Sequence, residues 1–152
     1  MKLAIFGLGS SHGDDQIGWV LVDALQGLLP EGVICEKLTS PAHSLVTLLP
    51  QFDQVIVIDA CEMEQKAGEY RYIEDGSGFL HMQNAPVSSH TLGISESWQL
   101  LLKLKQSLPQ ISLFLVQLGQ TETMASVSDC IAAQIPNMVE QLNKTVKLRC
   151  IN

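Results

Sequence analysis

The sequence has few basic residues and no long apolar run. Nine Lys and Arg stand against 16 Asp and Glu, which gives a formal charge of -7 and a pI near 4.9. Such a surface repels phosphate backbones, so we expect no nucleic acid partner. No apolar stretch reaches the roughly 18–20 residues of a membrane span, and the opening MKLAIFGLGS lacks the long apolar core of a secretory signal. We therefore expect a cytoplasmic protein without a membrane segment.

Several common catalytic and cofactor motifs are also missing. The four cysteines lie far apart and form no CxxC pair, which excludes a thioredoxin-like motif and a zinc knuckle. The loop that begins GLG has His12 where a dinucleotide fingerprint requires its third glycine, and neither a P-loop nor a GxSxG elbow is present. Buried, inert thiols are the expected state of the cysteines. Cys61 is the cysteine that could belong to a site, because it lies two residues beyond Asp59.

What the chain does have is an alternation of apolar strands and amphipathic helices. With 152 residues, 46% of them apolar, it can build one sizeable core, so residues 1–152 are expected to form a single domain. The pattern predicts an α/β fold with a mostly parallel sheet and helices on both faces. Strands are predicted at 2–7, 33–38, 55–59, 69–74 and 111–117, a turn at 75–78, and helices at 17–28, from Pro41, at 92–108 and at 126–146, the last divided or kinked at Pro136.

Three polar residues are expected at one edge of this sheet. Asp15 lies in the loop after the first strand, Asp59 closes the third strand, and His90 stands just before a leucine-rich helix. Ligands of open parallel sheets gather outside the carboxyl ends of the strands. Two carboxylates and one imidazole would form a divalent-metal site with open coordination positions.

Each of these residues also has a structural interpretation. Asp15 could cap the first helix, Asp59 could accept a hydrogen bond from a neighbouring loop, and His90 could be a surface or capping histidine. His12 could belong to a site, although a solvent-facing loop histidine is the favoured interpretation. Sequence alone leaves these alternatives open.

Taken together, the motifs resemble those of the hydrogenase maturation proteases. The resemblance is carried by GLGSSHGDDQIG, VIVIDA and SSHTLGI, which occur in the family's order and at its approximate spacing. It implies a twisted five-stranded sheet and an endopeptidase that removes a short C-terminal extension from the large-subunit precursor of a nickel-containing hydrogenase. It further implies that Asp15, Asp59 and His90 contact nickel, which is carried by the substrate rather than held by the enzyme.

The sequence departs from the family pattern in two places. Ser10 replaces a common asparagine in a loop that is one residue shorter, and the Gly-Gly-Thr found after the second strand is here Leu38-Thr39-Ser40 preceded by a lysine. Both places lie where the substrate would approach, so the choice of precursor stays open.

The chemistry also leaves alternatives. The metal could polarise the scissile carbonyl or lower the pKa of an attacking water, or an aspartate could act as general base while nickel only locates the bond. Two other classes of function compete with the protease. One is a non-catalytic chaperone that senses metal loading, and the other is a small-molecule enzyme, of the nucleoside-processing type, on a similar sheet.

Overall fold

The computed structural model describes residues 1–39, 41–80, 89–121 and 125–151, without the side chains of 41–43, 79 and 89–93. Five strands form one sheet in the order β2-β1-β3-β5-β4. The four strands β1 (Leu3–Leu8), β2 (Ile34–Leu38), β3 (Gln54–Cys61) and β5 (Gln110–Gln117) are parallel, whereas β4 (Tyr70–Ile73) runs antiparallel to β5 at the edge. The predicted α/β class, with its mostly parallel five-stranded sheet, is confirmed.

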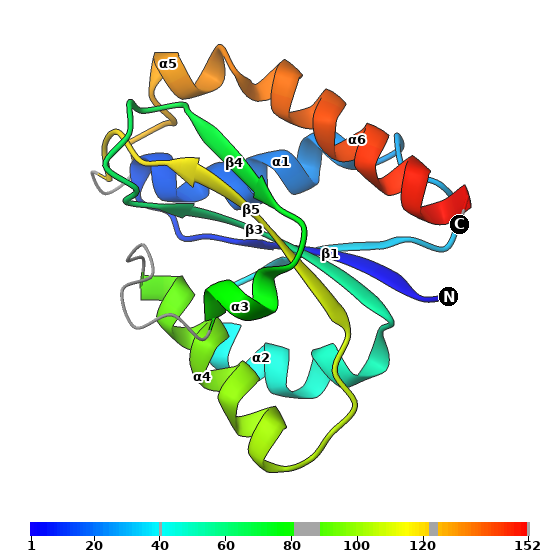
Figure 1. The fold of residues 1–152 in the computed structure, drawn as a ribbon. Helices are drawn as coiled ribbons and strands as arrows, with labels where there is room; N and C mark the ends of the chain where they lie inside the picture. Colours follow the sequence, from blue (N-terminus) through cyan, green and yellow to red (C-terminus); the bar gives the residue numbers. More distant parts are fainter. Residues whose placement is uncertain (40, 81–88, 122–124, 152) are drawn as a thin grey trace.

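Helices cover both faces of the sheet and make three layers (Figure 1). One face packs against α1 (Ile17–Leu25), α5 (Asp129–Ala132) and α6 (Ile135–Ile151), and the other against α2 (Pro41–Leu48), α3 (Gly76–Leu80) and α4 (Ser89–Lys103). Short 3₁₀ turns, η1 (Gly13–Gln16) and η2 (Leu49–Gln51), precede α1 and follow α2. No helix in the described part of the chain is both long and apolar enough to cross a bilayer.

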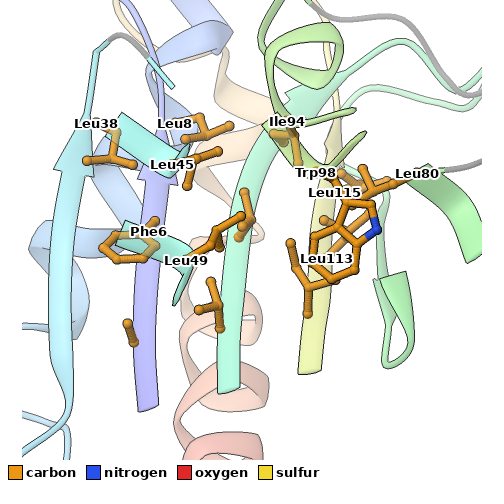
Figure 2. Close-up of a cluster of buried hydrophobic side chains, with 14 of the residues drawn as sticks. Phe6, Leu8, Leu38, Leu45, Leu49, Leu80, Ile94, Trp98, Leu113 and Leu115 are labelled. Atoms are coloured by element: carbon orange, nitrogen blue, oxygen red, sulfur yellow. The ribbon is translucent and has the colours of Figure 1, made fainter. Parts of the chain in front are cut away.

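The central strands are buried on both faces, as their unbroken apolar runs predict. Side chains on the α2/α4 face form one apolar cluster (Figure 2), and alternate side chains of the same strands meet α1 and α6 on the other face. Six apolar side chains of β1, β3 and β5 are at most 2% exposed: Ile5, Phe6, Val57, Ile58, Leu113 and Leu115.

Several of the predicted boundaries were wrong. The segment expected to be a turn at 75–78 is the start of α3, which Asp75 favours by accepting hydrogen bonds from the Ser77 amide and hydroxyl. Strand β3 continues beyond Asp59 because Ala60 and Cys61 still pair with β5. Helices α1 and α4 end earlier than their apolar patterns suggest, whereas α6 continues to Ile151, beyond the predicted end at residue 146.

Local backbone geometry explains both helix ends. Helix α1 ends at Leu25, just before Gly27, which adopts a φ of +81°. Helix α4 starts earlier than predicted, at Ser89, and ends at Lys103, because Lys105 adopts a positive φ while the Gln106 amide bonds back to the Leu101 carbonyl. The division predicted at Pro136 is confirmed: α5 and α6 are separate, and the proline lies in the first turn of α6.

Candidate active site

Asp15 lies on η1, in the loop that leaves the carboxyl end of β1. Its Oδ2 accepts a hydrogen bond of 2.6 Å from the Ser10 hydroxyl, and its backbone carbonyl accepts one of 3.3 Å from the Ser10 amide. Ser10, the first residue after the glycine turn, thus bonds both the carboxylate and the backbone of Asp15. Asp15 is half-buried, and Gln16 rather than Asp15 occupies the N-cap of α1. The structure therefore gives no support to the capping interpretation of Asp15.

Asp59 is a fully buried carboxylate in the carboxyl-terminal half of β3. The alternation of side chains along the strand places it on the same face as Val57 and Cys61, which belong to the apolar cluster under α2 and α4. Its neighbour on β5 is Leu115. A charged group in such surroundings is costly unless a hydrogen-bond donor or a cation compensates it.

His90 lies in the first turn of α4, not before the helix as the sequence analysis predicted. This turn is at the end of the molecule where β3 and β5 have their carboxyl ends, and α4 covers the face on which Asp59 lies (Figure 1). The His90 side chain is outside the described part of the structure, so the predicted convergence of Asp15, Asp59 and His90 stays a prediction. Among the described residues, no three His, Cys, Asp or Glu side chains are grouped to hold a metal ion.

Asp14, the neighbour of Asp15, has a role that the sequence analysis missed. Its buried carboxylate accepts four hydrogen bonds from the segment between β5 and α5. The amides of Gly119 and Gln120 donate to Oδ2 at 2.7 and 2.6 Å, the Ser128 amide donates to Oδ1 at 2.6 Å, and the Ser128 hydroxyl donates to Oδ2. The Asp14 amide in turn donates to the Gln120 carbonyl at 2.7 Å.

These donors keep Asp14 ionised. Burial alone would raise the pKa of its carboxyl, but the hydrogen bonds from Ser128, Gln120 and Gly119 together outweigh it and lower the pKa below the usual 3.8. No sequence pattern links Asp14 to residues more than 100 positions away. The only local signals are a glycine just after an apolar strand and a serine just before a helix.

A second buried polar residue orders the loop that follows β3. Gln117, at the end of β5, accepts hydrogen bonds at Oε1 from the amides of Met63 (2.7 Å) and Gln65 (3.2 Å) and donates from Nε2 to the Glu62 carboxylate (3.0 Å). The loop beside the carboxyl end of β3 is therefore tied to the neighbouring strand.

The other two candidates of the sequence analysis have unremarkable surroundings. Cys61 is fully buried, and burial, followed by the negative charges of Asp59 and Glu62, raises the pKa of its thiol to about 12. It is therefore no nucleophile at neutral pH. The expectation of buried thiols holds for Cys61 and was wrong for Cys130 and Cys150, which are exposed. His12 is exposed in the loop, as the solvent-facing interpretation expects.

Close packing explains why glycines are needed in the loop after β1 and at the start of α1. A Cβ on Gly7 would lie 2.2 Å from the Gly18 carbonyl oxygen, and a Cβ on Gly18 would lie 2.1 Å from that of Leu8. Strand β1 and helix α1 can approach this closely only because both positions lack a side chain. Gly13 has a φ of +51° and would meet the Gln120 carbonyl, so it too must be glycine.

Comparison with known proteins decides the family. A model of the family described as hydrogenase maturation protease matches residues 39–145, which include Asp59 and His90. The chain belongs to the hydrogenase maturation protease family. The predicted enzyme class, a maturation endopeptidase, is thereby confirmed. Asp14 and Asp15 lie outside the matched residues, and no curated protein sequence matches the chain.

Solved structures of hydrogenase maturation proteases share the fold of this chain. The hydrogenase maturating endopeptidase HybD from E. coli superposes with a TM-score of 0.82 at 22% identity, over 98% of this chain and 94% of that one. The [NiFe] hydrogenase maturation protease HybD from Thermococcus kodakarensis gives 0.77 at 20% identity, over 96% and 99%. HycI from the same organism gives 0.72 at 21% identity, over 96% and 92%. At these identities the likeness establishes the fold, which extends over nearly the whole chain.

Proposed function

We propose that this protein removes a C-terminal extension from the large-subunit precursor of a nickel-containing hydrogenase, after nickel has been installed in that precursor. The observation that carries the proposal is the family match, which covers the part of the chain that contains Asp59 and His90. Asp15 extends the candidate site to the loop after β1, which reaches the same edge of the sheet.

In this proposal nickel is part of the substrate. Carboxylate oxygens and an imidazole nitrogen suit a borderline divalent ion, and thiolates of the precursor would supply its remaining ligands. In this arrangement Asp15, Asp59 and His90 contact the metal only when the precursor is bound.

Two catalytic routes follow from this arrangement. In the first, nickel polarises the scissile carbonyl or lowers the pKa of the attacking water. In the second, Asp15 or Asp59 removes a proton from the water while nickel only places the bond. In both routes Asp15 meets the substrate with a carboxylate whose Oδ2 is already engaged by the Ser10 hydroxyl.

The cytoplasm is the proposed location of the reaction. All four cysteines, Cys35, Cys61, Cys130 and Cys150, are free thiols in the structure, as is usual for proteins of a reducing compartment.

The experiment that tests the proposal is a cleavage assay on a purified precursor. Nickel-loaded and nickel-free precursors are incubated with the protein, and the C-terminus of each product is read by mass spectrometry. Loss of a defined C-terminal peptide from the loaded precursor only is the expected result. Binding of the loaded precursor without cleavage would instead assign the chain to the chaperone class.

A chelator separates substrate-borne metal from a resident one. Three ligands without a thiolate should hold metal weakly in the absence of substrate, so pretreatment of the enzyme alone with a chelator should leave cleavage of loaded precursor intact. Tight stoichiometric zinc, with activity lost on its removal, would make the protein an ordinary metalloprotease.

A further inference from the structure

The segment that carries Asp15 is held in part by local hydrogen bonds. Ser10 donates to Asp15 from its hydroxyl and from its amide, and the Gln16 side-chain amide donates to the Gly13 carbonyl. The turn η1 is four residues long and has no side-chain cap. Within it, the Asp15 amide donates to the His12 carbonyl at 3.0 Å. A single 3₁₀ turn of this length is weak, because its hydrogen-bond geometry is poor and its ends are open.

Hydrogen bonds to the segment between β5 and α5 add long-range attachments to these local ones. Asp14 contributes its four accepted hydrogen bonds and the bond from its amide to Gln120. Gln16 adds a bond of 2.6 Å from its side-chain amide to the Ala125 carbonyl. The residues on both sides of Asp15 are therefore tied to chain more than 100 positions away, whereas Asp15 itself is half-buried at the sheet edge.

The space around the Asp14 carboxylate is also closely filled. A Cβ on Gly119 would lie 2.7 Å from Asp14 Oδ2 and 3.0 Å from the Ser128 Oγ. These contacts, which we call the cage of Asp14, hold the carboxylate in place. Because Asp15 is the next residue in the chain, a shift of Asp14 would also move Asp15. Charge-assisted hydrogen bonds of this kind are the strong ones in proteins.

We propose that Asp14 is a positioning residue, which orients Asp15 toward the substrate through its buried cage with Gly119, Gln120 and Ser128. Asp14 itself touches neither substrate nor metal. Its effect on the reaction rests on the proposed function, since it acts through a residue of the proposed site. Displacement of a reacting group by about 1 Å can cost roughly 100-fold in rate, so loosening the cage should affect turnover as well as stability.

Ser128→Ala is the variant that tests this most cleanly. It removes the hydroxyl donor to Asp14 but keeps the amide donor and the charge. Ser128→Thr restores the hydroxyl and should restore the rate. Ser112→Ala is the matched control. The Ser112 hydroxyl also makes two hydrogen bonds, because it donates to the Glu74 carbonyl and accepts from Arg149. Ser112 pairs with Ile56 near the amino ends of the strands, away from the candidate site.

Two readouts are measured, each below the unfolding temperature of every variant. One is kcat on saturating nickel-loaded precursor, and the other is the hydrogen-exchange rate of the Asp15 amide. We expect Ser128→Ala to lower kcat and to speed exchange at Asp15, Ser128→Thr to resemble the parent, and Ser112→Ala to change neither. Asp14→Asn, if it folds, should do the same as Ser128→Ala more strongly, by roughly 100-fold in kcat.

Opposite results separate the two proposals. If Ser128→Ala keeps the parent kcat and the parent exchange rate, or if Ser112→Ala alters both equally, the positioning role is wrong. If the parent protein cleaves no precursor, the proposed function is wrong. The exchange rate at Asp15 would in that case still decide whether the cage orders this residue.

Discussion

Replacing Asp14 with asparagine keeps the size of the side chain and removes its charge. The asparagine would place its oxygen where Oδ2 now accepts three hydrogen bonds, and its NH₂ group would then face the Ser128 amide. One buried amide would lose its acceptor, which costs about 1–3 kcal/mol, and three charge-assisted bonds would become neutral ones, a loss of about 1 kcal/mol each. The asparagine carries no charge, so the cost of burying a charge disappears, and this offsets part of the loss in stability.

The expected net loss is about 3 kcal/mol in the free energy of unfolding at pH 7. For a domain of this size that corresponds to a fall of about 6–12 °C in Tm. Urea unfolding followed by circular dichroism measures the loss directly. Asp23→Asn is the control, because Asp23 is exposed and pairs with Lys37 at the surface, where ion pairs contribute little.

The loss should also depend on pH, with a sign set by the lowered pKa. Because the folded-state pKa of Asp14 lies below the usual 3.8, its ionised form stabilises the protein fully above that value and loses its effect as the pH falls through the folded-state pKa. The gap between parent and Asp14→Asn should therefore narrow in acid. A variant within 1 kcal/mol of the parent at pH 7, or a gap that widens in acid, would refute the reasoning.

Two further predictions concern the packing of the core. Gly18→Ala should destabilise the protein by about 1–3 kcal/mol or more, because the new Cβ would lie 2.1 Å from the Leu8 carbonyl oxygen. Equal urea midpoints for Gly18→Ala and the parent would contradict this close approach. Gly32 offers a contrast, because a Cβ there would have open space around it although the φ of +89° disfavours a side chain. A thiol reagent should modify exposed Cys130 in the native protein but reach buried Cys61 only after unfolding, as read by peptide mass spectrometry; equal rates at the two cysteines would show that this part of the sheet is open.

The sequence predicts the sheet well because its strands are buried on both faces. The run Val55–Ile58 has no polar alternation, and such runs are typical of central parallel strands. Short elements are harder to predict. Helix α3 begins Gly-Ser-Gly, a composition typical of a turn, and forms because Asp75 provides its cap.

The residues of the candidate site also differ in how well the sequence predicts them. Asp59 stands out in the sequence because a carboxylate interrupts an apolar strand, and the structure places it in the core. Asp14 does not stand out, because its partners lie 105–114 residues further along the chain and three of its four hydrogen bonds come from backbone amides. Backbone donors have no sequence signature, so such a cage becomes visible only in the folded chain.

The most direct test of the account is the processing of nickel-loaded precursor by Asp59→Asn. The variant keeps the shape of the side chain and removes its charge, and Tm and circular dichroism establish whether it is folded. We expect a folded protein whose processing rate is at least roughly 100-fold lower, the usual loss when one electrostatic contact to a reacting group is removed. Processing at the parent rate by folded Asp59→Asn would contradict the central claim, since the buried carboxylate would then contribute no charge to the reaction.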